Sequence, residues 1–540
     1  MGKKKNTTTR PVSFPDLTDD FLLNRSRSIG IGLMVLAALT ALFVYQFGLT
    51  AAADDASYII RGKEFFSLGA WPGEQGPLYC VLLGVVILIA GMNLTLLKLL
   101  SLVGIIGFVY YFWKFFVHHV SPGVLLTTLV ILLLSPIIMP YASINYSETV
   151  FMLISIGCVI WFFKFFDLLG QSDFKIKIHS KTLLILISLI VALYLTRTVG
   201  IFIIGSLFLF LIFHKKYQAA GALILGSIAG ICAIMVIRYV FWDIAPFSNG
   251  QASMFLAKNA YDASKGNESL MGFVTRFHQN SIQYLSRHFF RMLGFLPFDN
   301  ETKNVYGYGM IYILSATLLI YIFKRNKYLF FSGLYGLSMC VITFVILHVF
   351  WNQDRLIIPF FPFVLLFLFG SLLQLFKDKW PALRPVVYVL MLLLPLISLN
   401  RYTRSVNIKS IQEGLLGNRL YNYTTEWKNY IEAIQYIGKS EPKTTFAATR
   451  KAELAQIYSG GRNFYGINQA AEANNVDEFL KKLKDAGVNT FILDQCLGTF
   501  SGIYNTVEAR YPGTFKSYKQ FGGKDRPTHL CKINYPPSIK

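Results

Sequence analysis

Two adjacent carboxylates and two cations follow the first long apolar segment of the sequence. Asp54 and Asp55 stand in AADDASYIIRGKEFF, and Arg61 and Lys63 come a few residues later. A carboxylate at a membrane surface can act as a general base, or can bind a metal ion or an acceptor group. The same residues can also cap a helix at an interfacial turn. Adjacent residues of a helix point about 100° apart, so we expect only one of the two aspartates to face a site.

Three further groups of charged residues lie at the ends of apolar segments. Glu148 stands in SINYSETVF, Arg197 in LYLTRTVG, and Asp354 and Arg355 in WNQDRLIIPFFPF. Singly, they can be a helix-capping carboxylate, a snorkelling arginine and an internal Asp–Arg pair. Together they place at least two carboxylates and two arginines on one face of a membrane. Arginine holds phosphate oxygens bidentately and a carboxylate deprotonates a hydroxyl, so the set fits a reaction whose leaving group is a lipid phosphate.

A long segment between apolar runs, 243–305, carries more cations in an aromatic-rich context, namely Arg276, His278, Arg287, His288 and Arg291. We interpret this segment as a candidate lid or interfacial helix. Its part RHFFRMLGF is more typical of an amphipathic segment at a bilayer surface than of a catalytic one.

The sequence gives little sign of a metal or nucleotide site. Its histidines lack the spacing of zinc ligands, and it has no Walker loop or dinucleotide fingerprint. A divalent cation could bind at Asp54 or Asp55, but no ligand set indicates one. The sequence therefore identifies no particular cofactor, and a divalent cation is the one candidate left open.

Composition identifies the elements that must position these residues. Of the 540 residues, 54% are hydrophobic and only 15% are charged, whereas soluble domains have about 25% charged residues. This excludes an ordinary soluble or disordered protein. The formal net charge of +22 fits either nucleic-acid binding or basic cytoplasmic loops, and its position in short loops between apolar runs favours the loops. We predict no nucleic-acid partner.

We predict a polytopic α-helical membrane protein, because a bilayer core needs about 20 apolar residues per helix. About eleven segments qualify as transmembrane helices: 29–49, 95–117, 122–141, 147–167, 181–196, 199–214, 218–242, 306–324, 328–350, 356–376 and 384–400. The apolar segment 77–91 is too short, and counting it as a span would turn the lysine-rich loops outward. We interpret it as a juxtamembrane helix on the outer side.

Orientation follows from the positive-inside rule. Six Lys and Arg residues precede the first span, and basic loops recur near 175–181, 215–216, 324–327 and 377–384. We therefore predict a cytoplasmic leader over 1–28, a first span that acts as a signal anchor, and a transmembrane domain over 29–400. The predicted location is the bacterial inner (plasma) membrane.

After residue 400 the spans stop, and polar amphipathic patterns begin. NVDEFLKKLKDAG predicts a helix that starts near Asn475 and stops at a glycine, and NTFILDQ predicts a short buried strand. KTTFAATR and KAELAQIYSG predict a strand followed by a helix. We predict a small α/β domain over 401–540 on the outer face. Its two cysteines, Cys496 and Cys531, are either bridged or unpaired, because sequence cannot supply their separation.

The order of these motifs resembles the GT-C superfamily of membrane glycosyltransferases, in particular the branch of protein O-mannosyltransferases and aminoarabinose-to-lipid-A transferases. The matching pieces are, in order, the acidic pair Asp54–Asp55, Pro77-Leu78-Tyr79, the turn SPIIMPYASINYSE, Leu195-Thr196-Arg197, and Arg355 followed by Pro359 and Pro362. The resemblance covers roughly residues 29–400. The chain departs from the family where Asp54-Asp55 replaces Asp-Glu and where Gly76-Pro77 replaces Pro-Pro.

The resemblance implies a glycosyltransferase that uses a polyprenyl- or dolichyl-phosphate sugar donor and inverts the anomeric carbon. Asp54 would take the proton of a lipid, glycan or protein acceptor, with Asp55 as the alternative base. Arg197 and Arg355 would hold the lipid phosphate, with Lys63 or Arg61 as a further contact. Glu148 and Asp354 would serve as a second carboxylate or bind the acceptor.

Two other classes fit many apolar spans. A transporter or flippase would carry charges near the middle of its spans and often inverted repeats, whereas the charges here lie at span ends. A polysaccharide polymerase or ligase would also act on lipid-linked glycans. Sugar transfer from a purified polyprenyl-phosphate sugar separates the three.

Overall fold

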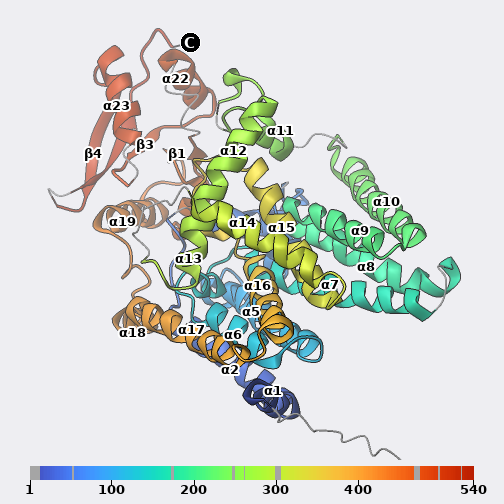
Figure 1. Cartoon of the computed structure of the whole chain (residues 1–540). Coiled ribbons are helices and arrows are strands. Elements are labelled where there is room, and N and C mark those ends of the chain that lie inside the picture. Colours follow the sequence, from blue (N-terminus) through green and yellow to red (C-terminus); the bar gives the residue numbers. More distant parts are fainter. Residues whose placement is uncertain are drawn as a thin grey trace, which may run out of the picture.

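A computed structural model describes most of the chain. The described residues are 13–51, 54–73, 75–171, 175–245, 250–260, 262–297, 306–467, 475–496, 499–523 and 526–539. A large group of helices is followed by a small region of strands and helices near the C-terminus (Figure 1). The predicted fold class, a polytopic helical protein with a C-terminal α/β part, is confirmed.

Among the described residues, eight helices are long and apolar enough to cross a membrane. They are α2 (Ser26–Phe43), α5 (Leu94–Phe116), α7 (Glu148–Gln171), α8 (Ile176–Thr196), α10 (Tyr217–Trp242), α15 (Lys327–Ile346), α16 (Phe361–Lys379) and α17 (Arg384–Ser405). Shorter apolar helices are α4 (Pro77–Ala90), α6 (Pro122–Leu133), η2 (Thr198–Phe202) with α9 (Ile203–Phe213), and α14 (Gly307–Ile322). The chain is an integral, multi-pass membrane protein.

Some predicted boundaries are wrong for local reasons. The predicted span 122–141 is interrupted, because α6 ends at Leu133 and the chain continues through Pro136 into the short helix η1 (Met139–Ser143). A proline disfavours the helical backbone conformation of the residue before it. Hydropathy alone does not reveal such a break in a helix. At the other extreme, α17 continues five residues beyond the predicted end at 400, although Pro395 lies inside it.

The helix that carries the acidic pair, α3 (Asp54–Leu68), packs closely against α4. A Cβ atom on Gly62 would lie 2.3 Å from the carbonyl oxygen of Cys80, and one on Gly84 would lie 2.4 Å from the carbonyl oxygen of Gly62. Only glycine permits this approach of two helix backbones, as at other crossings built from small residues. The contact fixes the direction in which α3 presents its first turn.

The remaining short helices lie in two stretches. The segment before α14 contains α11 (Gly250–Leu256), η3 (Ala263–Lys265), α12 (Leu270–Gln283), the π-helical turn η4 (Tyr284–His288) and α13 (Phe289–Met292). Helix η5 (Asp354–Leu356) precedes α16, and α18 (Ile408–Leu415) follows α17.

The first helix lies at the end of the molecule opposite the strands (Figure 1). Helix α1 (Phe14–Asn24) is held there by Asp19, whose carboxylate accepts hydrogen bonds from the hydroxyls of Ser121 (3.0 Å) and Tyr388 (2.7 Å). Arg384 pairs with Asp16 at 2.8 Å. The loops before α6 and before α17 therefore both contact α1.

The C-terminal part contains a five-stranded sheet in the order β2-β1-β3-β5-β4, in which β1 is parallel to β2 and β3 while β5 is antiparallel to β3 and β4. Its elements are α19 (Thr425–Ser440), β1 (Ala447–Thr449), α20 (Ala452–Tyr458), β2 (Tyr465–Gly466), α22 (Val476–Asp485), β3 (Thr490–Leu493), α23 (Thr499–Arg510), β4 (Phe515–Phe521) and β5 (Thr528–Ile533). The strands and helices predicted around 443–459 and 475–495 are confirmed.

The two cysteines of this part are free. Cys531 lies in β5 opposite Phe491 of β3, and the Cys496 thiol donates to the carbonyl oxygen of Glu426 at 3.4 Å. Of the two alternatives that the sequence leaves open, the structure has the unpaired one.

Candidate active site

The two aspartates at the start of α3 have different surroundings. Asp54 has a side chain that is 41% exposed, and its carboxylate accepts a hydrogen bond from the guanidinium of Arg355 at 2.8 Å. Asp55 is fully buried and accepts hydrogen bonds from the backbone N–H of Thr50 (2.8 Å), the hydroxyl of Thr50 (3.0 Å) and the N–H of Ala56 (3.0 Å). The two carboxylates diverge as expected for neighbours on a helix, and Asp54 is the one that faces open space.

Asp55 belongs to an anchor beneath the site. Lys98, a buried residue near the start of α5, donates to the carbonyl oxygens of Gln46 and Gly48, the latter at 2.6 Å. Burial raises the pKa of Asp55 to about 6, while the hydrogen bonds from Thr50 and the charge of Lys98 act in the opposite direction. These contacts fix residues 46–50 against α5 and the start of α3. Sequence reasoning missed Lys98, because it stands alone in an apolar run.

A second ion pair lies beside the first. Glu148, at the start of α7, forms an ion pair with Arg197, and their side chains are 2% and 18% exposed. Arg197 stands where α8 ends, in extended backbone. Burial raises the pKa of Tyr58 to about 12, and the charges of Glu148, Arg197, Arg355 and Asp54 all act on its hydroxyl. The four residues predicted to share one face are thus brought together around Tyr58.

Aromatic rings form the wall of this cluster. The guanidinium of Arg355 lies 4.9 Å from the ring centroid of Tyr146, a cation–π geometry. Tyr58 packs edge-to-face against Tyr146 at 6.4 Å and against Tyr79 at 5.5 Å between ring centroids. Tyr79 is the tyrosine of the Pro-Leu-Tyr motif, and its hydroxyl lies 3.0 Å from that of Ser101.

Asp354 does not pair with Arg355, although the two are adjacent. It binds Nδ1 of His288, and Arg291 approaches it at 3.9 Å. On its other side, Nε2 of His288 lies 2.6 Å from the Asn352 side-chain oxygen, which also accepts from Arg287. Asp354 therefore holds the loop 352–355 that presents Arg355 to Asp54.

These contacts correct the interpretation of RHFFRMLGF as an amphipathic segment at the bilayer surface. Arg287, His288 and Arg291 are 0%, 1% and 6% exposed. The π-helical turn η4 directs adjacent cations toward the loop before α16 instead of toward lipid. The sequence could not show this, because Asn352 and Asp354 lie more than 60 residues away.

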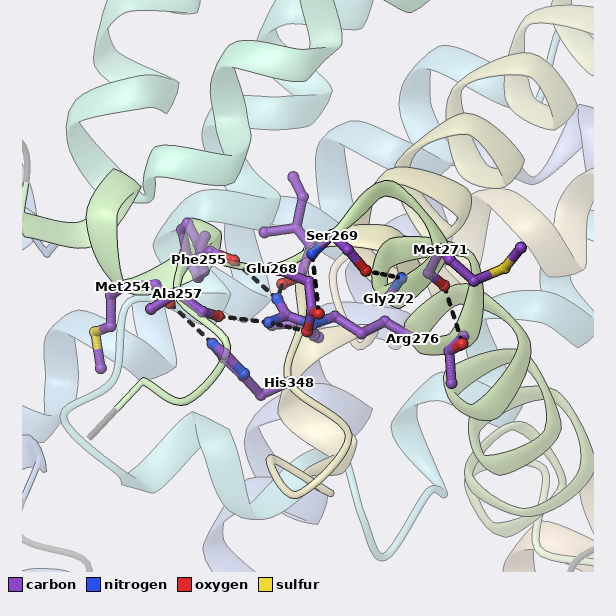
Figure 2. A network of polar contacts seen from close by, with 12 residues as sticks. Met254, Phe255, Ala257, Glu268, Ser269, Met271, Gly272, Arg276 and His348 are labelled. Atoms are coloured by element: carbon purple, nitrogen blue, oxygen red, sulfur yellow. Dashed lines mark hydrogen bonds and ion pairs between the residues drawn. The ribbon is translucent and has the colours of Figure 1, made fainter. Parts of the chain in front are cut away.

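Arg276, which stands in the segment interpreted as a lid, is also a structural residue (Figure 2). Its guanidinium donates to the carbonyl oxygens of Ala257 (2.6 Å) and Phe255 (2.8 Å) and pairs with Glu268 at 2.9 Å. Nearby, Nε2 of His348 lies 2.9 Å from the carbonyl oxygen of Met254. The network fastens residues 254–257 and Glu268 to α12 and to the end of α15. His278 instead lies 2.9 Å from the hydroxyl of Tyr308.

Arg61 and Lys63 lie further along α3. The Arg61 guanidinium lies close to Gly73, where an added Cβ would be 3.3 Å from it. Within the described ranges, neither residue forms an ion pair with Asp54, Glu148 or Asp354. Their assignment as phosphate contacts stays a prediction.

The described residues contain no group of three or more His, Cys, Asp and Glu side chains that could hold a metal ion. Asp54 and Asp55 diverge, and Asp54 and Glu148 each face an arginine. The carboxylates of the site thus do not form a ligand set for a divalent cation.

Solved structures with a similar fold are known. The chain shares its fold with solved structures of ArnT, in agreement with the fold expected from the resemblance to the GT-C superfamily. It superposes on ArnT from Cupriavidus metallidurans in the apo state with a TM-score of 0.55 at 15% sequence identity, over 94% of this chain and 98% of that chain. ArnT bound to undecaprenyl phosphate gives a TM-score of 0.53 at 14% identity, with the same coverage. No family model and no curated protein matches the sequence.

Proposed function

We propose that this protein is an integral-membrane glycosyltransferase that moves a sugar from a polyprenyl-phosphate donor to an acceptor at the outer face of the membrane. The observation that carries the proposal is the pairing of half-exposed Asp54 with Arg355, beside the pair of Glu148 and Arg197, in a GT-C fold. The similarity to a structure with bound undecaprenyl phosphate supports the class of donor.

Arg197 and Arg355 bind the phosphate group of the lipid-linked donor. A phosphate group accepts bidentate hydrogen bonds from a guanidinium, so it competes with the carboxylate of Asp54 for Arg355. Donor binding would then loosen the Asp54–Arg355 pair and leave the carboxylate available to the acceptor. Charge that develops on the leaving phosphate oxygen is stabilised by the same guanidinium groups.

Asp54 acts as the general base. Its carboxylate takes the proton of the acceptor as the acceptor atom forms a bond to the anomeric carbon. The bond between that carbon and the phosphate oxygen breaks, and its electron pair stays on the lipid phosphate. Attack opposite the leaving group inverts the anomeric centre. Asp55 keeps the segment before α3 in place and does not reach the acceptor.

The boundaries that accompany this function are also proposals: a cytoplasmic leader over 1–28, a catalytic transmembrane part over 29–400 and an outer α/β domain over 401–540. The acceptor is a lipid, a glycan or a protein. We propose that this protein is located in the bacterial inner membrane.

The test is transfer by the purified, detergent-solubilised protein. Lipids that copurify are analysed by mass spectrometry for a polyprenyl-phosphate sugar, and the identified donor is then incubated with protein and candidate acceptors. We expect release of polyprenyl phosphate that the variant D54N does not catalyse. Movement of the lipid-linked sugar across proteoliposome membranes without any transfer would identify a flippase and refute the proposal.

A further inference from the structure

The carboxyl ends of the parallel strands in the C-terminal sheet lie near the acidic pair. β1 is the central strand of the order β2-β1-β3, so the chain crosses from one side of β1 to the other between β2 and β3. In open α/β sheets, ligands bind outside the carboxyl ends of the strands at such a change of direction. The residues at this edge are Arg450 and Lys451 after β1, and Asp494 after β3.

This edge is packed onto the membrane part. Helix α20, which follows Lys451, contacts α3, and Leu454 and Ala455 share a buried cluster with Ala56 and Ile59 of α3. A contact of buried apolar side chains on both helices leaves little freedom for relative movement. The loop between β1 and α20 is therefore held beside the first turn of α3.

Two tyrosines of the C-terminal part fix the segment just before the acidic pair. The N–H of Leu49 donates to the hydroxyl of Tyr458 at 3.2 Å, and the hydroxyl of Tyr423 donates to the carbonyl oxygen of Leu49. The two hydroxyls lie 3.1 Å apart. The next residue, Thr50, binds Asp55. Direct hydrogen bonds thus tie Leu49 to the C-terminal part and Thr50 to α3.

The charges agree with this placement. Burial lowers the pKa of Lys451, and the carboxylate of Asp54 is the group that most strongly opposes this effect. Burial likewise lowers the pKa of Arg450, against the charge of Asp494. Lys451 is half-buried, and its ammonium group lies within electrostatic reach of the Asp54 carboxylate.

We propose that Lys451, which stands between β1 and α20 beside the first turn of α3, is a substrate-binding residue that binds a phosphate group of the substrate. This deepens the proposed function, on which it rests, by making the site a composite of the membrane part and the outer part. The phosphate belongs either to the lipid-linked donor or to a phosphorylated acceptor. Lys451 does not take part in proton transfer.

The experiment compares K451M and K451R with the wild-type protein and with K481M, an exposed lysine on α22 that serves as the matched control. Thermal unfolding in detergent first establishes that all variants fold as the wild type does. Binding of undecaprenyl phosphate, the probe, is then measured by native mass spectrometry, and the KM of the acceptor is measured at saturating donor.

A hydrogen bond to a charged group corresponds to roughly a 10- to 100-fold change in binding. We expect K451M to weaken one of the two quantities by that factor with a small change in kcat, and K451R to restore most of it. Weaker probe binding assigns the donor phosphate, and a raised acceptor KM assigns an acceptor phosphate. A K451M protein that folds, yet matches K481M in both measurements, overturns the proposal.

The two proposals can fail separately. Wild-type protein that binds undecaprenyl phosphate through Lys451 but transfers no sugar counts against the proposed function and not against this site. Transfer that needs Asp54 but is indifferent to Lys451 has the opposite meaning. Wild-type protein that neither binds the probe nor transfers sugar overturns both.

Discussion

Exchanging each of the two adjacent aspartates should separate catalysis from folding. In D54N the amide keeps the shape of the side chain but cannot accept a proton. A general base contributes about 10²- to 10⁴-fold, which is about 2.7 to 5.4 kcal/mol of activation free energy at 1.36 kcal/mol per factor of ten. The pair that Asp54 forms with Arg355 is partly exposed, and such pairs stabilise by about 1 kcal/mol or less.

Asp55 gives the contrasting result. D55A removes three hydrogen bonds from a buried carboxylate, two from Thr50 and one from Ala56. Each hydrogen bond to a charged group contributes about 1.5 to 3 kcal/mol, so the total loss is several kcal/mol and appears as a lower unfolding temperature. E64Q, at another carboxylate of α3, should alter neither activity nor stability and is the control.

The assay is the initial rate of sugar transfer together with the thermal unfolding temperature, measured for the same preparations in detergent. Our reasoning predicts loss of rate at a nearly unchanged unfolding temperature for D54N, and a lower unfolding temperature for D55A. If D54N transfers at the wild-type rate, Asp54 is not the base. If D55N folds normally but is inactive while D54N is active, the two roles are exchanged.

Asp55 should also leave its own pH signature. Its pKa is about 6 in the folded protein, against about 3.9 in an unfolded chain. The folded state therefore binds the proton more tightly, and the stability that this provides is present below about pH 4 and lost as the pH rises through 6. A pKa difference of about two units between the folded and unfolded states corresponds to about 3 kcal/mol of unfolding free energy. The difference in stability between wild type and D55N should fall over this range, and a flat difference would contradict the burial of an ionisable Asp55.

Three further predictions follow from the packing. R276M should lower the unfolding temperature, because breaking a buried ion pair costs about 3 to 5 kcal/mol, and an unchanged temperature would mean that the network in Figure 2 is dispensable. In a cysteine-free background, Q353C should react with an impermeant thiol reagent added to intact cells and K379C should not, and the reverse would invert the proposed orientation. Cys496 and Cys531 should both be alkylated after unfolding without reductant, whereas blocked thiols at both positions would show a bridge.

The sequence predicted which charged residues lie together in the candidate site, but it did not predict their contacts. Charges at the ends of apolar segments predicted that Asp54, Glu148, Arg197 and Arg355 share one face, because the sidedness of a span end follows from hydropathy and loop charge alone. The choice of partners did not follow. Asp354 and Arg355 are neighbours in sequence, yet their side chains bind His288 and Asp54, more than 60 and 300 residues away.

The contribution of the C-terminal part left no signal in the sequence. Tyr423, Tyr458 and Lys451 are ordinary residues of an amphipathic α/β segment. The packing of α20 against α3 brings the two tyrosines into contact with Leu49 and places Lys451 near the start of α3. The strands and helices themselves were predictable, since Asn475 and the pattern of NTFILDQ are local features. The direction in which the sheet turns its carboxyl edge is a tertiary property.

Residues that contact one another in the candidate site lie far apart in the sequence, so they are synthesised at different times. Asp54 and Arg355 lie 301 residues apart, and Leu49 and Tyr458 lie 409 apart. At about 5 to 20 residues per second, the ribosome adds Arg355 roughly 15 to 60 s after Asp54, and it reaches Tyr458 later still. During that time the early spans already stand in the bilayer with the acidic pair uncovered by its partners. A chain that terminates prematurely thus keeps its early apolar helices but lacks the residues that complete the candidate site.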